Sequence, residues 1–198
     1  TLLGNRYWAS AAYDPMGDVI WIVGGLSTCS LKDVANNKPC TAKSIPTLYM
    51  KWDDKGVATL NTLSGGNQSI YGAKMVYDSA NKRMLISGGS SDGSRGLDKV
   101  TALSLDPADP TKAKFSTVST TGSAQLSFLG AAAYWGTNKW LVNAGGASTA
   151  IFLAGENANS KTIGLNMADP AKAAWVDLKA QANDRVGAVA EYAMNASG

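Results

Sequence analysis

Apolar and polar positions along the chain form a pattern that occurs three times and then begins a fourth time. A short apolar run ends at Tyr13, a polar turn covers 14–18, and a second apolar run covers 19–25. The same arrangement occurs around Tyr77 and Tyr134, and its first half occurs around Tyr192. Short apolar runs that flank turns rich in Asp, Asn, Gly and Pro are typical of β-hairpins. Each copy is therefore predicted to contain a strand, a tight turn and a second strand.

The copies are regularly spaced. Successive tyrosines are 64, 57 and 58 residues apart, and in three copies a pair of glycines begins eleven residues after the tyrosine. These diglycines are Gly24-Gly25, Gly88-Gly89 and Gly145-Gly146. Self-similarity at such a period is the mark of a repeat architecture, in which each unit packs on the next.

Two further strands are predicted in each copy. The third strands cover 47–52, 100–105 and 162–167, and the fourth cover 57–60, 115–118 and 174–178. Four short strands in one repeat of this length make up the blade of a β-propeller. We therefore expect an all-β partial propeller of three four-stranded blades and the start of a fourth. The predicted boundaries are 6–64, 65–121, 122–180 and 181–198.

The diglycines, the tyrosines and an outer-strand aromatic resemble the kelch repeat, which places this chain with the galactose-oxidase-like kelch superfamily of propellers. Trp175 matches the outer-strand Trp of the family, and Phe115 takes that place in the second copy. The resemblance and the crowding at a propeller axis both give the six glycines a structural role, since glycine permits close backbone approach. A closed propeller needs about four to eight blades. Further blades are expected from the same longer chain or from an oligomeric partner.

The chain offers little for catalysis. It contains no His, which removes Ser-His-Asp catalysis and His-based zinc or copper sites from this segment. The copper ligands of the oxidase branch of the superfamily are therefore missing here, and neither a phosphate-binding loop nor a dinucleotide fingerprint occurs. The sequence predicts no catalytic residue, no metal site and no cofactor.

The cysteines and the N-glycosylation sequons bear on where the protein is located. Cys29 and Cys40 lie in one polar loop and are predicted to form a local disulfide. Asn67 and Asn195 begin N-glycosylation sequons in predicted loops. Together these features predict a secreted or cell-surface glycoprotein. The net charge is +3 without a basic run, which argues against a nucleic-acid partner, and no apolar stretch approaches the roughly 18 residues of a membrane span.

The copies differ most in the loop that follows each diglycine. In a propeller these loops emerge on one face, and rigid scaffolds commonly carry binding residues on such loops. We expect this face to bind a protein or glycan, without catalysis in this segment. The alternative is the propeller portion of a larger secreted oxidase or hydrolase, with catalytic residues outside this chain. The candidate ligand-binding residues are Asp92, Arg95, Asp98, Phe152, Glu156 and Asn157.

Overall fold

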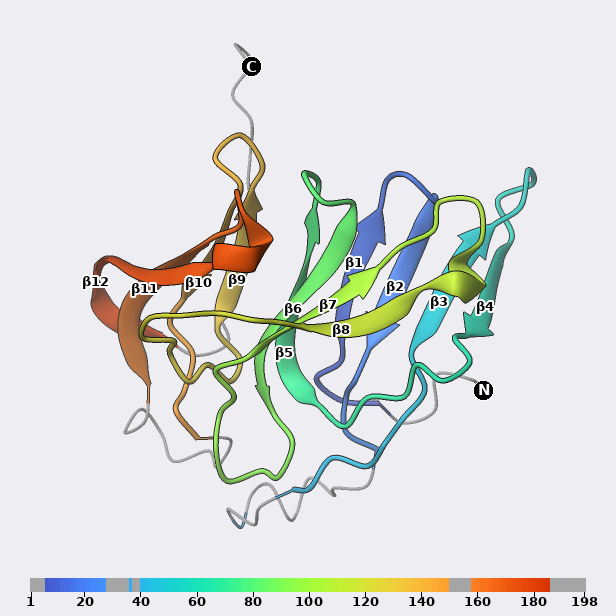
Figure 1. Cartoon of the computed structure of the whole chain (residues 1–198). Helices are drawn as coiled ribbons and strands as arrows, with labels where there is room; N and C mark the ends of the chain where they lie inside the picture. Colours follow the sequence, from blue (N-terminus) through green and yellow to red (C-terminus); the bar gives the residue numbers. More distant parts are fainter. Residues whose placement is uncertain (1–5, 28–35, 37–39, 150–157, 186–198) are drawn as a thin grey trace.

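The computed structural model describes residues 6–27, 36, 40–149 and 158–185, and for 179–185 it describes the backbone alone. Three four-stranded antiparallel sheets, with no α-helix in the described residues, confirm the predicted all-β class. Runs rich in β-branched and aromatic residues form the short strands, and segments rich in Asp, Asn, Gly and Pro form the turns between them. In Figure 1 the sheets stand side by side, each turned relative to the next.

Each sheet follows chain order, so every strand pairs with its neighbour in sequence. Sheet one contains β1 (Ser10–Asp14), β2 (Val19–Val23), β3 (Leu48–Trp52) and β4 (Ala58–Thr62). Sheet two contains β5 (Tyr71–Asp78), β6 (Arg83–Ser90), β7 (Val100–Ser104) and β8 (Lys114–Val118). Sheet three contains β9 (Ala131–Trp135), β10 (Trp140–Ala144), β11 (Asn159–Asn166) and β12 (Ala174–Arg185). Short 3-10 turns at Pro110–Lys112 and Pro170–Lys172 precede β8 and β12.

Most strand bounds agree with the prediction to within two residues, and β12 is the clear exception. It was expected to end at Leu178, but it continues to Arg185 by pairing with an extended β11. Irregular register between Asn159 and Lys161, and between Thr162 and Ile163, accompanies this extension. At the end of this extension Arg185 pairs with Asn159 of β11.

The strand register repeats from sheet to sheet. Tyr13 pairs with Ile20, Tyr77 with Met84 and Tyr134 with Leu141, so the partner always lies seven residues after the tyrosine. Following the ladder across each sheet defines one line of four side chains, which we call the tyrosine row. Its members are Tyr13, Ile20, Met50 and Leu60 in sheet one, Tyr77, Met84, Leu103 and Phe115 in sheet two, and Tyr134, Leu141, Leu165 and Trp175 in sheet three.

The core consists of layers between neighbouring sheets. The tyrosine row of sheet two packs on Trp21, Val23 and Tyr49 of sheet one. The row of sheet three packs on Leu85 and other residues of sheet two in the same way. Burial of these faces is the main favourable contribution to stacking, at about 25 cal/mol per Å² of apolar surface removed from water.

The first two diglycines lie against the segments that lead into the next sheet, at Ile70 and Ser127. The Gly25 amide donates to the Ile70 carbonyl at 2.7 Å, and the Gly89 amide donates to the Ser127 carbonyl at 2.6 Å. A Cβ on the preceding glycine would lie 2.2 Å from the Ile70 oxygen at Gly24, and 2.1 Å from the Ser127 oxygen at Gly88. At the first two diglycines there is thus no room for a side chain beside the backbone hydrogen bond to the next segment, whereas the Gly145 amide donates to the Lys161 carbonyl within sheet three.

Candidate functional site

The described parts of the loops that follow the three diglycines lie at one edge of the sheets, at the bottom of Figure 1. The Ala42 amide of the first loop donates to the Ser91 carbonyl of the second at 2.8 Å. The Gly96 amide of the second loop donates to the Ser148 carbonyl of the third, also at 2.8 Å. We call residues 40–46, 90–99 and 147–149 of these loops the loop face. Its backbone bonds make it one continuous surface.

An apolar cluster supports the loop face from below. Buried in it are Leu26, Cys40, Ala42 and Ala147, together with the rings of Tyr71, the first residue of β5, and Phe128, which precedes β9. Trp8 stacks on Tyr71 with ring centroids 5.9 Å apart, and Phe128 contacts both rings edge-on. Such aromatic packing fixes the loop bases, because it buries large rings in preferred geometries.

The second loop presents charge to solvent. The Asp92 carboxylate accepts hydrogen bonds from the backbone amides of Ser94 at 2.9 Å and Arg95 at 3.2 Å, and these amides lower its pKa. Asp92 is therefore an anion at neutral pH, and it also shapes the turn. The Arg95 guanidinium lies 4.0 Å from the Asp98 carboxylate, and both side chains are more than half exposed. An exposed pair of this kind contributes little to stability, which leaves both groups available for recognition.

Several predicted residues cannot be placed. Cys29, Phe152, Glu156, Asn157 and Asn195 lie outside the described residues. Cys40 is a buried residue of the loop face, and its pairing with Cys29 stays a prediction. Asn67 is exposed, in the connection between β4 and β5, where a glycan would have access to solvent.

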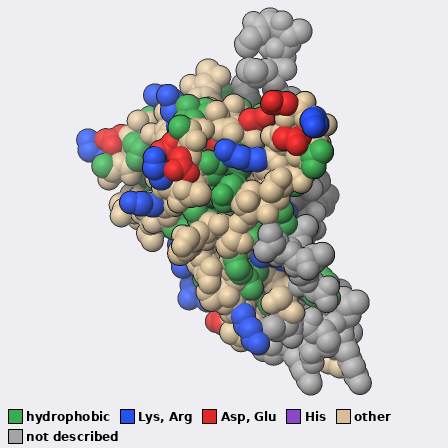
Figure 2. Space-filling model, turned by 90° about the vertical axis from the view of Figure 1, so that its right-hand side faces the viewer, with side chains coloured by type: hydrophobic (Ala, Val, Ile, Leu, Met, Phe, Trp, Pro, Cys, Tyr) green, Lys and Arg blue, Asp and Glu red, His purple; other side chains and the backbone are tan. Residues whose placement is uncertain are grey.

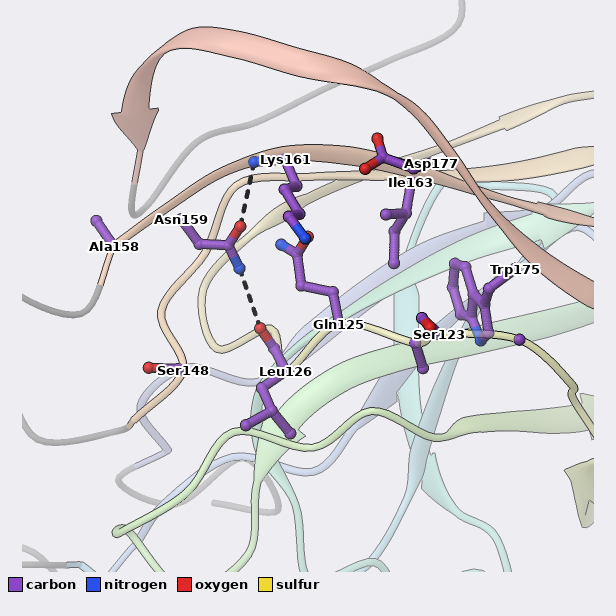
Figure 3. A pocket seen from close by; sticks show the side chains of 12 residues that line it. Ser123, Gln125, Leu126, Ser148, Ala158, Asn159, Lys161, Ile163, Trp175 and Asp177 are labelled. Atoms are coloured by element: carbon purple, nitrogen blue, oxygen red, sulfur yellow. Dashed lines mark hydrogen bonds between the residues drawn. The ribbon is translucent and has the colours of Figure 1, made fainter.

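Beside the loop face lies a cavity of about 840 Å³ that the sequence analysis did not predict. It separates the 122–126 linker from β11 and β12, and Ser148 of the third loop borders it. In Figure 3, Ser148 and Ala158 lie at one end, Trp175 lies at the other, and Gln125 stands between them. The lining residues come from four separate segments between 122 and 177, so no local sequence motif marks the cavity.

Hydrogen bonds hold the polar wall of this cavity in place. The Asn159 amide nitrogen donates to the Leu126 carbonyl at 3.3 Å, and its oxygen accepts from the Lys161 backbone amide at 3.2 Å (Figure 3). The Gln125 amide nitrogen donates to the Gly145 carbonyl at 3.1 Å. By contrast, Trp175 Nε1 and Gln125 Oε1 are buried without a hydrogen-bond partner among the described residues.

A smaller cavity of about 250 Å³ lies between the inner strands β1, β5 and β9. Small residues line most of it, as predicted for the centre of a propeller, but Lys74 also reaches it. Burial lowers the pKa of the Lys74 ammonium, because removal from water disfavours its charged form. The sequence analysis gave this lysine no role.

Within the described ranges, no three His, Cys, Asp or Glu side chains converge as metal ligands would. No helix in this part of the chain is long and apolar enough to cross a membrane.

Comparisons with known proteins identify the fold. No family model and no curated protein matches the sequence. Among solved structures, a fungal alcohol oxidase of the AA5 family in complex with copper matches 94% of this chain with a TM-score of 0.58 at 11% identity. The structure of YjhT matches 92% of it with a TM-score of 0.59, also at 11% identity. This chain covers 45% and 54% of those two chains, about half of each. The likeness shows a kelch propeller fold, present here as a partial propeller.

Proposed function

We propose that this chain is part of an extracellular kelch propeller that binds a protein or glycan partner through the loop face. The observation that carries the proposal is the pair of backbone bonds that join Ala42 to Ser91 and Gly96 to Ser148. Loops fixed to one another in this way present a preorganised surface, which lowers the entropy lost on binding. The exposed Arg95 and Asp98 provide charged groups for specificity on that surface.

Secretion or cell-surface display forms part of the proposal. It is supported by the two cysteines in one loop and by the exposed Asn67 in its sequon. The polypeptide made in a secreting host is expected to gain glycan mass at Asn67 and Asn195, and to yield a Cys29–Cys40 peptide only before reduction. Peptide mass spectrometry with and without deglycosylation measures both. Unmodified Asn67 together with two free thiols would contradict this part of the proposal.

Further propeller blades are also proposed as partners, from the same longer chain or from an oligomeric partner. Within the described residues, no sheet covers the tyrosine row of sheet one, and Tyr13 is 50% exposed. Figure 2 views the side on which β3 and β4 lie, and hydrophobic side chains are visible there among charged ones. Exposed apolar faces of this kind favour association with a matching surface.

Binding through the loop face can be tested by a single charge reversal. Arg95→Glu changes an exposed residue of an i,i+3 ion pair, so the fold should be unaffected while affinity for the partner falls at least tenfold. Lys172→Glu changes another exposed i,i+3 pair, remote from the loop face, and is the matched control. Binding of both variants to glycan arrays and to cell surfaces measures the effect. Equal binding by both variants would contradict a role for the loop face.

The alternative is that the chain is the propeller portion of a larger secreted oxidase or hydrolase. It is favoured by the fold likeness to a copper-containing alcohol oxidase, of which this chain covers 45%. The catalytic residues would then lie outside this chain. Assay of the longest natural polypeptide for alcohol oxidation with added copper, beside the Arg95→Glu binding test, discriminates the two functions.

A further inference from the structure

The three sheets form a stack with an open face at each end. Each interface inside the chain joins the tyrosine row of one sheet to the opposite face of the sheet before it. Sheet two is packed on both faces, whereas sheets one and three each have one face that no sheet covers within the described residues. Figure 1 shows sheets one and three on either side of sheet two. The open face of sheet one is its tyrosine row, and that of sheet three is the side opposite its row.

The open face of sheet three is apolar. Val142 lies eight residues after Tyr134, in the place that Trp21 and Leu85 take after their own tyrosines. The next sheet buries those two side chains fully, but Val142 is half-buried, and Val176 in the same line of the sheet is 45% exposed. Side chains that alternate along β9, β10 and β12 make up this surface, which we call the closing face: Trp135, Trp140, Val142, Val176 and Leu178.

The closing face departs from the other sheets at the residue that follows the tyrosine. In sheets one and two this residue is a buried aspartate that lies near the tyrosine of the next sheet, as Asp14 does for Tyr77 and Asp78 for Tyr134. In sheet three it is Trp135, which is 43% exposed. A sheet that packs on the closing face would therefore meet an aromatic ring where the inner interfaces have a carboxylate.

Tyr13 of sheet one suits such a neighbour. Its hydroxyl already donates to Asp18 of its own turn at 2.9 Å, so it needs no carboxylate from a preceding sheet. Its exposed ring can instead pack against the ring of Trp135, and aromatic pairs bury a large apolar area. The two ends of the stack thus match each other at the position where the end sheets differ from sheet two.

We propose that the tyrosine row of sheet one binds the closing face of sheet three between two copies of this chain, which together form a closed ring. Three sheets from each of two copies make six, within the range of about four to eight blades in closed propellers. A twofold axis lets the two copies cover both pairs of open faces at once. The chain covers 54% of YjhT, so two copies supply about as much chain as that propeller contains. The inference rests on the proposed function, because it selects a second copy as the source of the further blades.

Sedimentation velocity of the 198-residue chain between about 0.1 and 100 μM tests the proposal, because association depends on concentration. The mass is expected to rise from that of one chain to that of two and then to remain constant, since a closed ring leaves no open face. Tyr13→Glu and Val176→Glu each place a charge on one of the two open faces. Each should weaken the dimer at least tenfold, because a carboxylate buried in an apolar interface is costly.

Ser116→Glu is the matched control. Ser116 is exposed and has in β8 the ladder position that Val176 has in β12, but it belongs to the middle sheet. This variant should dimerise as the unaltered chain does, and circular dichroism checks that all three variants are folded.

The proposal is overturned if the chain stays monomeric at the highest concentration, if its mass continues to rise beyond two chains, or if Ser116→Glu weakens the dimer as much as the other variants do. Loss of the dimer in only one of Tyr13→Glu and Val176→Glu would also overturn it, because the two faces would then not meet each other. A monomeric chain whose partner is still lost on Arg95→Glu would refute the ring of two copies alone and leave binding through the loop face intact.

Discussion

Tyr13 and Tyr134 occupy the same place in their sheets, yet Tyr13 is 50% exposed and Tyr134 is 8% exposed. The contrast extends along the row. Leu141 and Leu165 of sheet three are fully buried, whereas Ile20 and Met50 of sheet one are half-buried. The residue types are alike, so composition does not explain the difference. Burial of a row depends on whether a preceding sheet packs against it.

The tyrosine hydroxyls show the same dependence. Burial, and then the Asp78 carboxylate of sheet two, raise the pKa of Tyr134 well above its ordinary value. Burial and the nearby Asp14 of sheet one raise the pKa of Tyr77 in the same manner. Tyr13, without a preceding sheet in the described residues, donates instead to Asp18 of its own turn at 2.9 Å. That hydrogen bond is the first cause of a raised pKa at Tyr13, whereas burial against the preceding sheet is the first cause at Tyr77 and Tyr134.

The largest expected effect comes from truncating the same row position in the two sheets. Leu141→Ala should lower the free energy of unfolding by about 2–5 kcal/mol, because it opens a cavity between packed sheets. Ile20→Ala should cost about 1 kcal/mol, since its side chain already meets water. Urea unfolding followed by tryptophan fluorescence measures both. Equal losses would show that the two rows have the same environment.

Close approach between sheets is tested at a diglycine. Gly88→Ala should cost about 2–4 kcal/mol, because Cβ would meet the Ser127 carbonyl and the residue has a φ of +71°. Gly56 has a φ of +74° but nothing within 4 Å of the added Cβ, so Gly56→Ala should lose only about 1–2 kcal/mol. The difference in free energy of unfolding between the two variants measures the cost of the contact with the Ser127 carbonyl, apart from the cost of the positive φ. Indistinguishable unfolding midpoints for the two variants would contradict the close contact between Gly88 and the Ser127 carbonyl.

The smallest effect is a dependence on alkaline pH. Because folded Tyr134 keeps its proton where the unfolded chain loses it, the free energy of unfolding should fall as pH rises above about 10. Between about pH 9 and 11 the unaltered protein should lose about 1 kcal/mol more than Tyr134→Phe. Tyr13→Phe, at an exposed site, should leave most of that slope in place. Urea unfolding across this pH range measures the free energy of unfolding of each protein. The prediction is contradicted if this free energy depends on pH in the same way in Tyr134→Phe and Tyr13→Phe.

The periodic features of the molecule were predictable from sequence. The register of Tyr13, Tyr77 and Tyr134 with their glycines gave the strand plan, because side-chain alternation and turn chemistry are local properties. The extension of β12 to Arg185 was not predictable, since it depends on irregular pairing with β11. The cavity around Gln125 and Trp175 was missed for a related reason. Its wall is assembled by the stacking of sheets, and nothing adjacent in the sequence marks it.

Methionine oxidation tests the repeated packing of rows most directly. Met84 of sheet two is fully buried, whereas Met50 occupies a row position in sheet one and is half-buried. In the folded, monomeric 198-residue polypeptide, brief hydrogen peroxide treatment with mass-spectrometric quantitation should oxidise Met50 at least tenfold faster than Met84. Equal protection of Met50 and Met84 in the monomeric polypeptide, separated by size-exclusion chromatography, would contradict the account, because the row of sheet one would then be covered without a partner.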